Sequence, residues 1–150
     1  MLIVPDTNVL ISGQLQPKGL ESAILKLWQH HILQFALSDD ILAEHRRVLL
    51  YPHIQKRLQW SLEQLDRLIE SLRKGSFIVP GILSVQDGAR DLSDNKFLVC
   101  AVEAKADVIV SGDEKHLQPL ESYRGIPILS PHLFVERYYV WRSYLSERWS

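Results

Sequence analysis

The sequence predicts an α/β fold in which a parallel sheet of four or five short strands is covered by helices on both faces. Short apolar runs alternate along the chain with longer segments in which apolar residues recur at helical spacing. The short runs are continuously apolar rather than alternating, which is typical of strands buried on both faces of a sheet. Together these two observations predict repeated strand–helix units and a layered α/β sandwich.

The first half of the chain carries two strand–helix units. Residues 2–4 form a compact apolar run and predict the first strand. A helix is expected over 20–28, where apolar residues fall at i, i+4, i+7 and i+8 on one helical face. Residues 35–37 predict the second strand, and Ser38 is a suitable N-cap for the helix that follows. This helix should end near Pro52, because the residue before a proline disfavours helical backbone angles.

The second half repeats the pattern. Ser61 and Gln64 form a capping box for a helix that should end at Gly75. A loop with a short extended piece at 77–79 follows, and Asp94 is placed to cap the next helix. The last elements are listed in chain order: a strand at 108–110, a strand at 126–129, and an aromatic-rich C-terminal helix at about 132–149.

Length and composition favour one soluble domain over residues 1–150. The chain is 46% hydrophobic and 23% charged, which excludes a disordered or collagen-like chain. A single cysteine, Cys100, excludes an internal disulfide framework and a cysteine-based zinc site. We expect a cytoplasmic protein without a membrane-spanning segment, since no export signal or long apolar run is present. The net charge of −1 gives no general indication of a nucleic-acid partner.

Four acidic residues are placed to meet at one end of the predicted sheet. Asp6 and Asp113 follow predicted strands, Glu44 lies in the helix after the second strand, and Asp94 begins a later helix. Ligands of open parallel sheets bind beyond the carboxyl ends of the strands. Singly, the three aspartates have explanations as caps or turn residues, and Glu44 as a solvated helix residue. Clustered, they would repel one another unless a hard divalent cation neutralised them, and oxygen ligands favour Mg²⁺ or Mn²⁺ over zinc.

Four segments resemble those of PIN domains, in the same order and spacing from about residue 2 to 135. They are LIVPDTNVL at 2–10, ILAEH at 41–45, DNKFL at 94–98 and VIVSGD at 108–113. The most similar group is described as VapC-like toxins of toxin–antitoxin systems. The resemblance implies a Rossmann-like α/β/α sandwich and a Mg²⁺/Mn²⁺-dependent endoribonuclease that hydrolyses phosphodiester bonds of single-stranded RNA. It implies a protein antitoxin as partner.

The resemblance also assigns roles within the site. The catalytic and metal-binding residues would be Asp6, Glu44, Asp94 and Asp113, with Asp6 and Asp94 as principal ligands and the other two binding directly or through water. Three further polar residues, Thr7, Asn8 and Ser111, would orient these ligands or contact the phosphate. Relatives often carry an acid where this chain has Lys115 and His116. The choice between one and two metal ions therefore stays open.

Two further segments each have two interpretations. Residues 45–60 contain no acid and include Arg46, Arg47, Lys56 and Arg57. They predict either a contact to the backbone of single-stranded or structured RNA or a solvated helix edge. The C-terminal aromatic residues either pack on the domain's own sheet or form a surface for an antitoxin or a second copy in a homo-oligomer.

Two rival functions remain for comparison. One is a catalytically degenerate PIN fold that only binds RNA or protein, although the presence of all four acids argues against it. The other is a phosphoryl-transfer enzyme of the haloacid-dehalogenase type, whose chemistry requires Asp-x-Asp after the first strand. This chain has Asn8 at the second acidic position of that motif, so the motif is incomplete.

Overall fold

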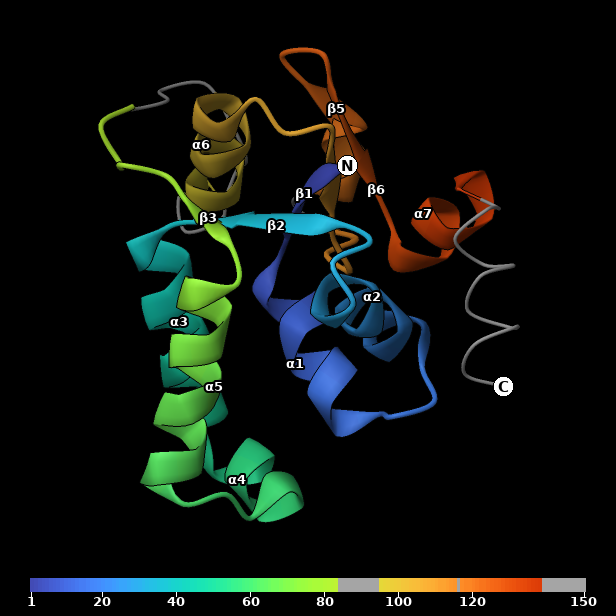
Figure 1. Ribbon diagram of the computed structural model, residues 1–150. Coiled ribbons are helices and arrows are strands. Elements are labelled where there is room, and N and C mark those ends of the chain that lie inside the picture. Colours follow the sequence, from blue (N-terminus) through green and yellow to red (C-terminus); the bar gives the residue numbers. More distant parts are fainter. Residues whose placement is uncertain (84–94, 116, 139–150) are drawn as a thin grey trace.

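The computed structural model describes residues 1–83, 95–115 and 117–138, and these residues form one sheet with helices packed around it (Figure 1). The strands are β1 (Leu2–Pro5), β2 (Gln34–Leu37), β3 (Phe77–Ile78), β4 (Val108–Val110), β5 (Ser122–Tyr123) and β6 (Ile126–Leu129). The helices are α1 (Thr7–Leu15), α2 (Leu20–Gln29), α3 (Asp39–Leu49), α4 (Pro52–Leu58), α5 (Leu62–Lys74), α6 (Asn95–Ala104) and α7 (Pro131–Arg137). A 3₁₀ turn, η2, spans Gln118–Leu120.

The strand order is β3-β2-β1-β4-β6-β5, and all neighbours are parallel except β5 and β6. This confirms the predicted α/β class with a mostly parallel sheet. The chain builds outward from β1 in one direction through β2 and β3, and then crosses to the other side of β1 with β4. The junction of β1 and β4 is therefore the point where the strand order reverses, which is where open α/β sheets bind ligands.

The strand β5 was not expected, because the prediction was a sheet of four or five parallel strands. β5 runs antiparallel to β6 and is joined to it by Arg124 and Gly125, which both have positive φ values of 49° and 82°. Such a pair matches the two-residue hairpin turns with left-handed central residues. Because β5 is two residues long and its turn lacks the usual Asn-Gly signal, the sequence did not predict it.

Most helices follow the predicted pattern, but α1 and α4 were not predicted. α1 was not predicted, because Val9, Leu10 and Ile11 are all buried and its apolar residues show no single stripe. The helix expected to end near Pro52 does end there, as α3, and a second helix that was not predicted, α4, begins at Pro52, in a first turn where proline is well tolerated. The capping box of Ser61 and Gln64 is present at the start of α5.

The C-terminal helix also differs in its described extent. α7 begins at Pro131 and ends at Arg137, because Tyr138 has φ and ψ of −102° and 60°, outside the helical region. The rest of the expected helix, from residue 139 on, lies outside the described residues. Of the helices that the structure does describe, none is long and apolar enough to cross a membrane.

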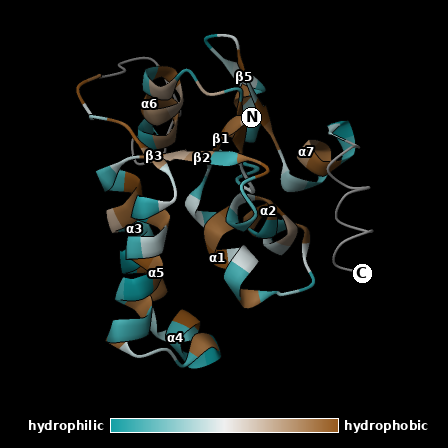
Figure 2. Ribbon diagram, in the orientation of Figure 1, coloured by the Kyte–Doolittle hydropathy of each residue, from teal (hydrophilic) through white to brown (hydrophobic). Residues whose placement is uncertain are grey.

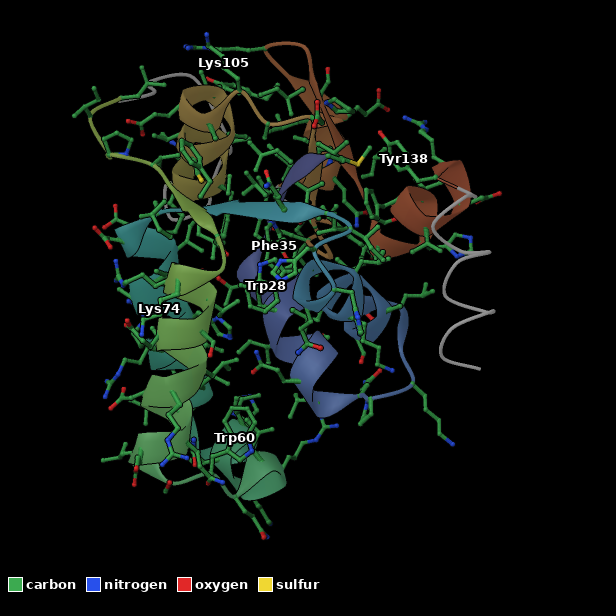
Figure 3. The ribbon with its side chains drawn as sticks, in the orientation of Figure 1. Trp28, Phe35, Trp60, Lys74, Lys105 and Tyr138 are labelled. Carbon is green, nitrogen blue, oxygen red and sulfur yellow. The ribbon has the colours of Figure 1, made fainter. Side chains whose placement is uncertain are left out.

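The core lies on both faces of the sheet. In the view of Figure 1, α6 lies above β2, and α1 and α2 lie below it. Trp28 of α2 stacks on Phe35 of β2 with ring centroids 5.3 Å apart (Figure 3). α1 and α2 approach closely at Gly13, where a Cβ atom would lie 2.4 Å from Leu25 Cδ1. Gly13 therefore allows α1 to be fixed against α2, and α1 carries the first residues of the candidate site.

A second apolar cluster joins α4 and α5 to the rest of the molecule. Its buried members are Ile11, Leu49, Ile54 and Leu65. Figure 2 shows hydrophilic and hydrophobic residues on both α4 and α5, as expected of helices with one buried and one solvated face. Residues of α3 thus have fixed neighbours on both sides, which matters because Glu44 extends from this helix.

Candidate functional site

Asp6 lies at the junction of β1 and β4. The register pairs Pro5 with Val110, and the Asp6 N–H continues this ladder by donating to the Val110 carbonyl at 2.9 Å. Its side chain caps α1, because Oδ1 accepts a hydrogen bond from the Val9 N–H at 2.9 Å. Asp6 is only 2% exposed. Asp6 is therefore the N-cap of α1, as one of its two interpretations predicted. Its second oxygen, Oδ2, points to Ser111 at the end of β4.

Ser111 connects Asp6 to Asp113. The Ser111 hydroxyl donates to Asp6 Oδ2 and accepts from the Asp113 N–H at 2.9 Å. Gln118 fixes the same loop by donating from its side-chain nitrogen to the Ser111 carbonyl at 2.8 Å. Because Ser111 is fully buried, both aspartates are held on a rigid support at the carboxyl ends of adjacent strands.

Burial dominates the electrostatics of Asp6. Desolvation raises the pKa of Asp6 from 3.8 to about 6, against the lowering effect of the hydrogen bonds from Ser111 and Val9. The negative charge of Asp113 also raises the pKa of Asp6, but contributes less than burial does. The protein therefore compensates the charge of this carboxylate only in part, and a bound cation would stabilise the ionised form.

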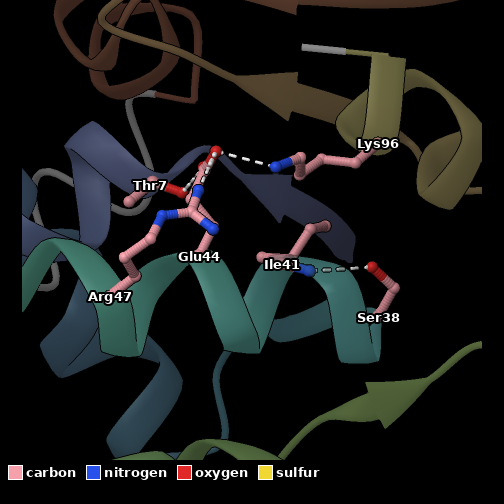
Figure 4. A network of polar contacts seen from close by, with 6 residues as sticks. All are labelled: Thr7, Ser38, Ile41, Glu44, Arg47 and Lys96. Atoms are coloured by element: carbon pink, nitrogen blue, oxygen red, sulfur yellow. Dashed lines mark hydrogen bonds and ion pairs between the residues drawn. The ribbon is translucent and has the colours of Figure 1, made fainter. Parts of the chain in front are cut away.

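Glu44 extends from α3 to the same region and has a cationic partner (Figure 4). Its Oε1 lies 2.7 Å from the Lys96 ammonium, and its Oε2 accepts a hydrogen bond from the Thr7 hydroxyl. A guanidinium nitrogen of Arg47 lies 3.7 Å from Oε1. The Glu44 and Lys96 side chains are only 15% and 18% exposed, so this ion pair is largely shielded from water.

These groups surround a cavity of about 190 Å³. Its lining residues are Asp6, Thr7, Asn8, Glu44, Val48, Phe97 and Asp113. Three of the four predicted acids thus line one cavity, with Thr7 and Asn8 beside them. Ser111 does not line the cavity but holds Asp6 and Asp113 by hydrogen bonds. The fourth, Asp94, lies outside the described residues, as does His116. The helix that follows Asp94, α6, begins at Asn95 and contributes Phe97 to the cavity wall.

The described acids provide few oxygen donors for the divalent cation that the family resemblance implies. Within the described residues, no three His, Cys, Asp or Glu side chains lie close enough to hold one ion. Asp6 and Asp113 remain as a pair of oxygen donors on adjacent strand ends. Mg²⁺ is usually bound by one or two carboxylates, with water and substrate phosphate completing its coordination. This pair of aspartates fits that requirement.

Lys96 was not predicted from the sequence as a residue of the site. It lies in the first described turn of α6, where a cation is unfavourable because the helix dipole is positive at this end. This unfavourable placement was the available signal that the lysine has an acidic partner. The structure supplies the compensating acid as Glu44.

The basic residues of 45–60 lie in different surroundings. Arg46 donates to Asp66 of α5 at 2.9 Å, while Lys56 and Arg57 lie exposed on α4. His45 is fully buried, and desolvation lowers its pKa to about 4, so it is neutral at physiological pH. Arg47, Lys56 and Arg57 are therefore exposed to solvent, whereas Arg46 forms an ion pair with Asp66 of α5.

Replacing Ser111 with alanine should weaken Mn²⁺ binding by about tenfold or more, because supporting hydrogen bonds around metal ligands typically contribute that much. The variant loses the donor to Asp6 and the acceptor for the Asp113 N–H. Calorimetric Mn²⁺ titration measures the effect. Ser130→Ala is the matched control, since Ser130 caps α7 by accepting from the Leu133 N–H and does not line the cavity. Equal Mn²⁺ affinity in both variants would contradict the supporting role of Ser111.

Comparison with known proteins places this geometry in a family. Residues 3–115 match the family model described as PIN domain. The chain is 30% identical over 134 residues to the uncharacterized protein MJ1680 of Methanocaldococcus jannaschii, covering 89% of this chain and 84% of that protein. Its fold is similar to the crystal structure of VapBC2 from Rickettsia felis bound to a DNA fragment from their promoter. That match has a TM-score of 0.52 and 12% identity, and covers 87% of this chain and 98% of the other. The family match spans most of the sequence and includes Asp6, Glu44 and Asp113, and the chain therefore belongs to the PIN domain family.

Proposed function

We propose that this protein is a cytoplasmic Mg²⁺/Mn²⁺-dependent endoribonuclease that cleaves single-stranded RNA and serves as the toxin of a toxin–antitoxin pair. One observation carries the nuclease proposal. Asp6 and Asp113 are held by Ser111 at the ends of β1 and β4, where the strand order reverses, beside a cavity open to a ligand. Two carboxylates on one rigid support are suited to bind a divalent cation and, through it, a phosphodiester.

The residues would divide the work as follows. Asp6 and Asp113 would hold the cation, with Asp94 as the third acid that the family resemblance assigns. Glu44 contributes negative charge from the opposite wall. When bound, a divalent cation lowers the pKa of a water ligand and stabilises the charge that develops on the phosphate. Asn8 is exposed at the cavity and has both donor and acceptor atoms, so it would orient the phosphodiester.

RNA would approach along α3 and α4. The cavity itself is acidic, so the RNA backbone requires cations on its way to the site. Arg47 lies beside the cavity, and Lys56 and Arg57 continue the positive charge on α4. Arg46 would contribute less, because its guanidinium is bound to Asp66. This path favours an RNA strand lying across α3 rather than a compact ligand enclosed by the cavity.

The test is cleavage of a fluorescent single-stranded RNA by the purified protein. We expect internal cleavage with Mn²⁺ or Mg²⁺, loss of cleavage in EDTA, and recovery when Mn²⁺ is restored. Cleavage that continues in EDTA would contradict metal dependence. Binding of RNA without cleavage at any metal concentration would favour the second candidate, a degenerate PIN fold that only binds RNA or protein.

The toxin role rests on the likeness of the sequence to VapC-like toxins and of the fold to VapBC2. Expression of the chain in a bacterial host should arrest growth, and co-expression of a cognate antitoxin should relieve the arrest. Expression of the Asp6→Asn variant should leave growth unaffected. Equal arrest by both proteins would show that toxicity does not depend on the metal site.

A further inference from the structure

The Glu44 carboxylate has both oxygens engaged by the protein itself. Oε1 lies 2.7 Å from the Lys96 ammonium, and Oε2 accepts from the Thr7 hydroxyl. Thr7 is the first residue of α1 and directly follows Asp6, so this contact joins the Glu44 side of the cavity to the Asp6 side. A divalent cation that bound Glu44 directly would lie close to the Lys96 ammonium, and the two like charges would repel each other.

We propose that Lys96 is a built-in cation that occupies the place of a second divalent ion, so that the site takes up a single Mg²⁺ or Mn²⁺ at Asp6 and Asp113. This inference rests on the metal-binding part of the proposed function. It assigns to Lys96 a role in setting the number of metal ions, and to Glu44 the role of holding Lys96 rather than of ligating metal directly.

Charge balance supports a single ion. The described acids of the cavity carry three negative charges, from Asp6, Glu44 and Asp113. Lys96 already pairs with the charge of Glu44, and one divalent cation would neutralise those of Asp6 and Asp113. Two-metal sites place their ions only about 3.5–4 Å apart, so a second divalent ion at Glu44 would meet the Lys96 ammonium.

Burial and helix geometry support a fixed position for Lys96. The Lys96 side chain is only 18% exposed and reaches from α6 to α3. Its place in the first described turn of α6 is unfavourable for a cation, so the contact with Glu44 is what compensates it. Lys115, in contrast, is exposed beyond Asp113, and its backbone N–H donates to Asp113 Oδ1 at 3.0 Å.

The experiment counts bound Mn²⁺ by electron paramagnetic resonance and calorimetry on the full chain without RNA. We expect one Mn²⁺ in the wild-type protein and a second, weaker Mn²⁺ in Lys96→Gln, where Glu44 is released. The double variant Glu44→Gln/Lys96→Gln should return to one ion, and Lys96→Arg should stay at one because it keeps the charge. Lys115→Gln is the matched control, since it removes the same charge without freeing Glu44.

Two results would overturn the inference. The first is a count of two Mn²⁺ ions in the wild-type protein, a result that does not depend on the folding of any variant. The other is no gain of Mn²⁺ in Lys96→Gln when its metal-free melting curve shows a folded protein. The proposed nuclease function can fail separately. If the Mn²⁺ counts are as expected but the protein never cleaves RNA, the role of Lys96 stands and the nuclease proposal is wrong.

Discussion

Asp6→Asn should reduce metal-dependent RNA cleavage by on the order of 100- to 1,000-fold and should make the metal-free protein more stable. The loss of activity follows because the change removes one of the two described carboxylates that would hold the cation, whose stabilisation of transition-state charge is worth several kcal/mol. The gain in stability follows from burial. Asp6 is almost completely buried, and desolvation raises its pKa to about 6, so the ionised side chain destabilises the folded state at neutral pH.

The sign of the pH dependence can be worked out from the two pKa values. The folded-state pKa of Asp6, about 6, lies above the value of 3.8 for an unperturbed carboxyl group. Wild-type stability is therefore lost as the pH rises from about 4 through 6. Asparagine removes this loss, so the gain of about 1–3 kcal/mol in unfolding free energy should be complete above about pH 6 and vanish near pH 4. For a chain of this length it corresponds to a rise in melting temperature of about 2–12 °C at pH 7.5.

Asparagine can keep the cap of α1, because its side-chain oxygen still accepts from the Val9 N–H. Asp107→Asn is the control. Asp107 is an exposed aspartate that precedes β4 at the opposite end of the sheet and accepts from the Leu2 N–H. It should change neither cleavage nor its metal dependence. An Asp6→Asn protein that melts at a lower temperature and cleaves RNA normally would show that Asp6 is only a structural cap.

Phe134→Ala should destabilise the protein by about 3–5 kcal/mol, as is typical when a buried phenylalanine is truncated. Phe134 is fully buried, and the centroid of its ring lies 5.0 Å from that of Tyr138. α7 packs against α2 and β6, so the first part of the predicted aromatic helix belongs to the core. Urea denaturation at neutral pH measures the effect.

Leu133→Ala in the same helix provides the comparison. Leu133 is 47% exposed, so its truncation should change the unfolding free energy by about 0.5 kcal/mol or less. If Phe134→Ala were as mild as Leu133→Ala, α7 would not contribute to the core. Loss of oligomers in Leu133→Ala without loss of stability would instead identify this exposed face as a contact surface.

Much of the site could be predicted because it follows from strand order. Asp6 and Asp113 lie within three residues of the end of a continuous apolar run, and parallel strands bring their carboxyl ends together. Lys96 could not be placed in the same way, since its importance arises from a contact between α6 and α3, which are far apart in the sequence. Ser111 was predicted to orient the metal ligands, but its hydrogen bond to Asp6 Oδ2 could not be predicted, because it depends on the backbone conformation at the end of β4.

The missed elements have a related cause. α1 is buried around most of its circumference, so it lacks the amphipathic pattern that identifies α5. β5 is too short for any periodicity to be recognised, and its existence depends on a turn whose two residues both have positive φ. The spacing of apolar residues therefore predicted the elements that have one buried and one solvated face. It did not predict elements that are almost wholly buried or only two residues long.

The two outermost strands of the sheet, β3 and β5, are each only two residues long. Long unpaired strands at the margin of a sheet are templates for another chain, and short ones remove most of the hydrogen-bonding groups that such a chain would need. Recognition by strand addition is therefore disfavoured on both sides of this sheet. A protein partner is expected to bind through helical faces and side chains, and the sheet itself is protected from growing into an aggregate.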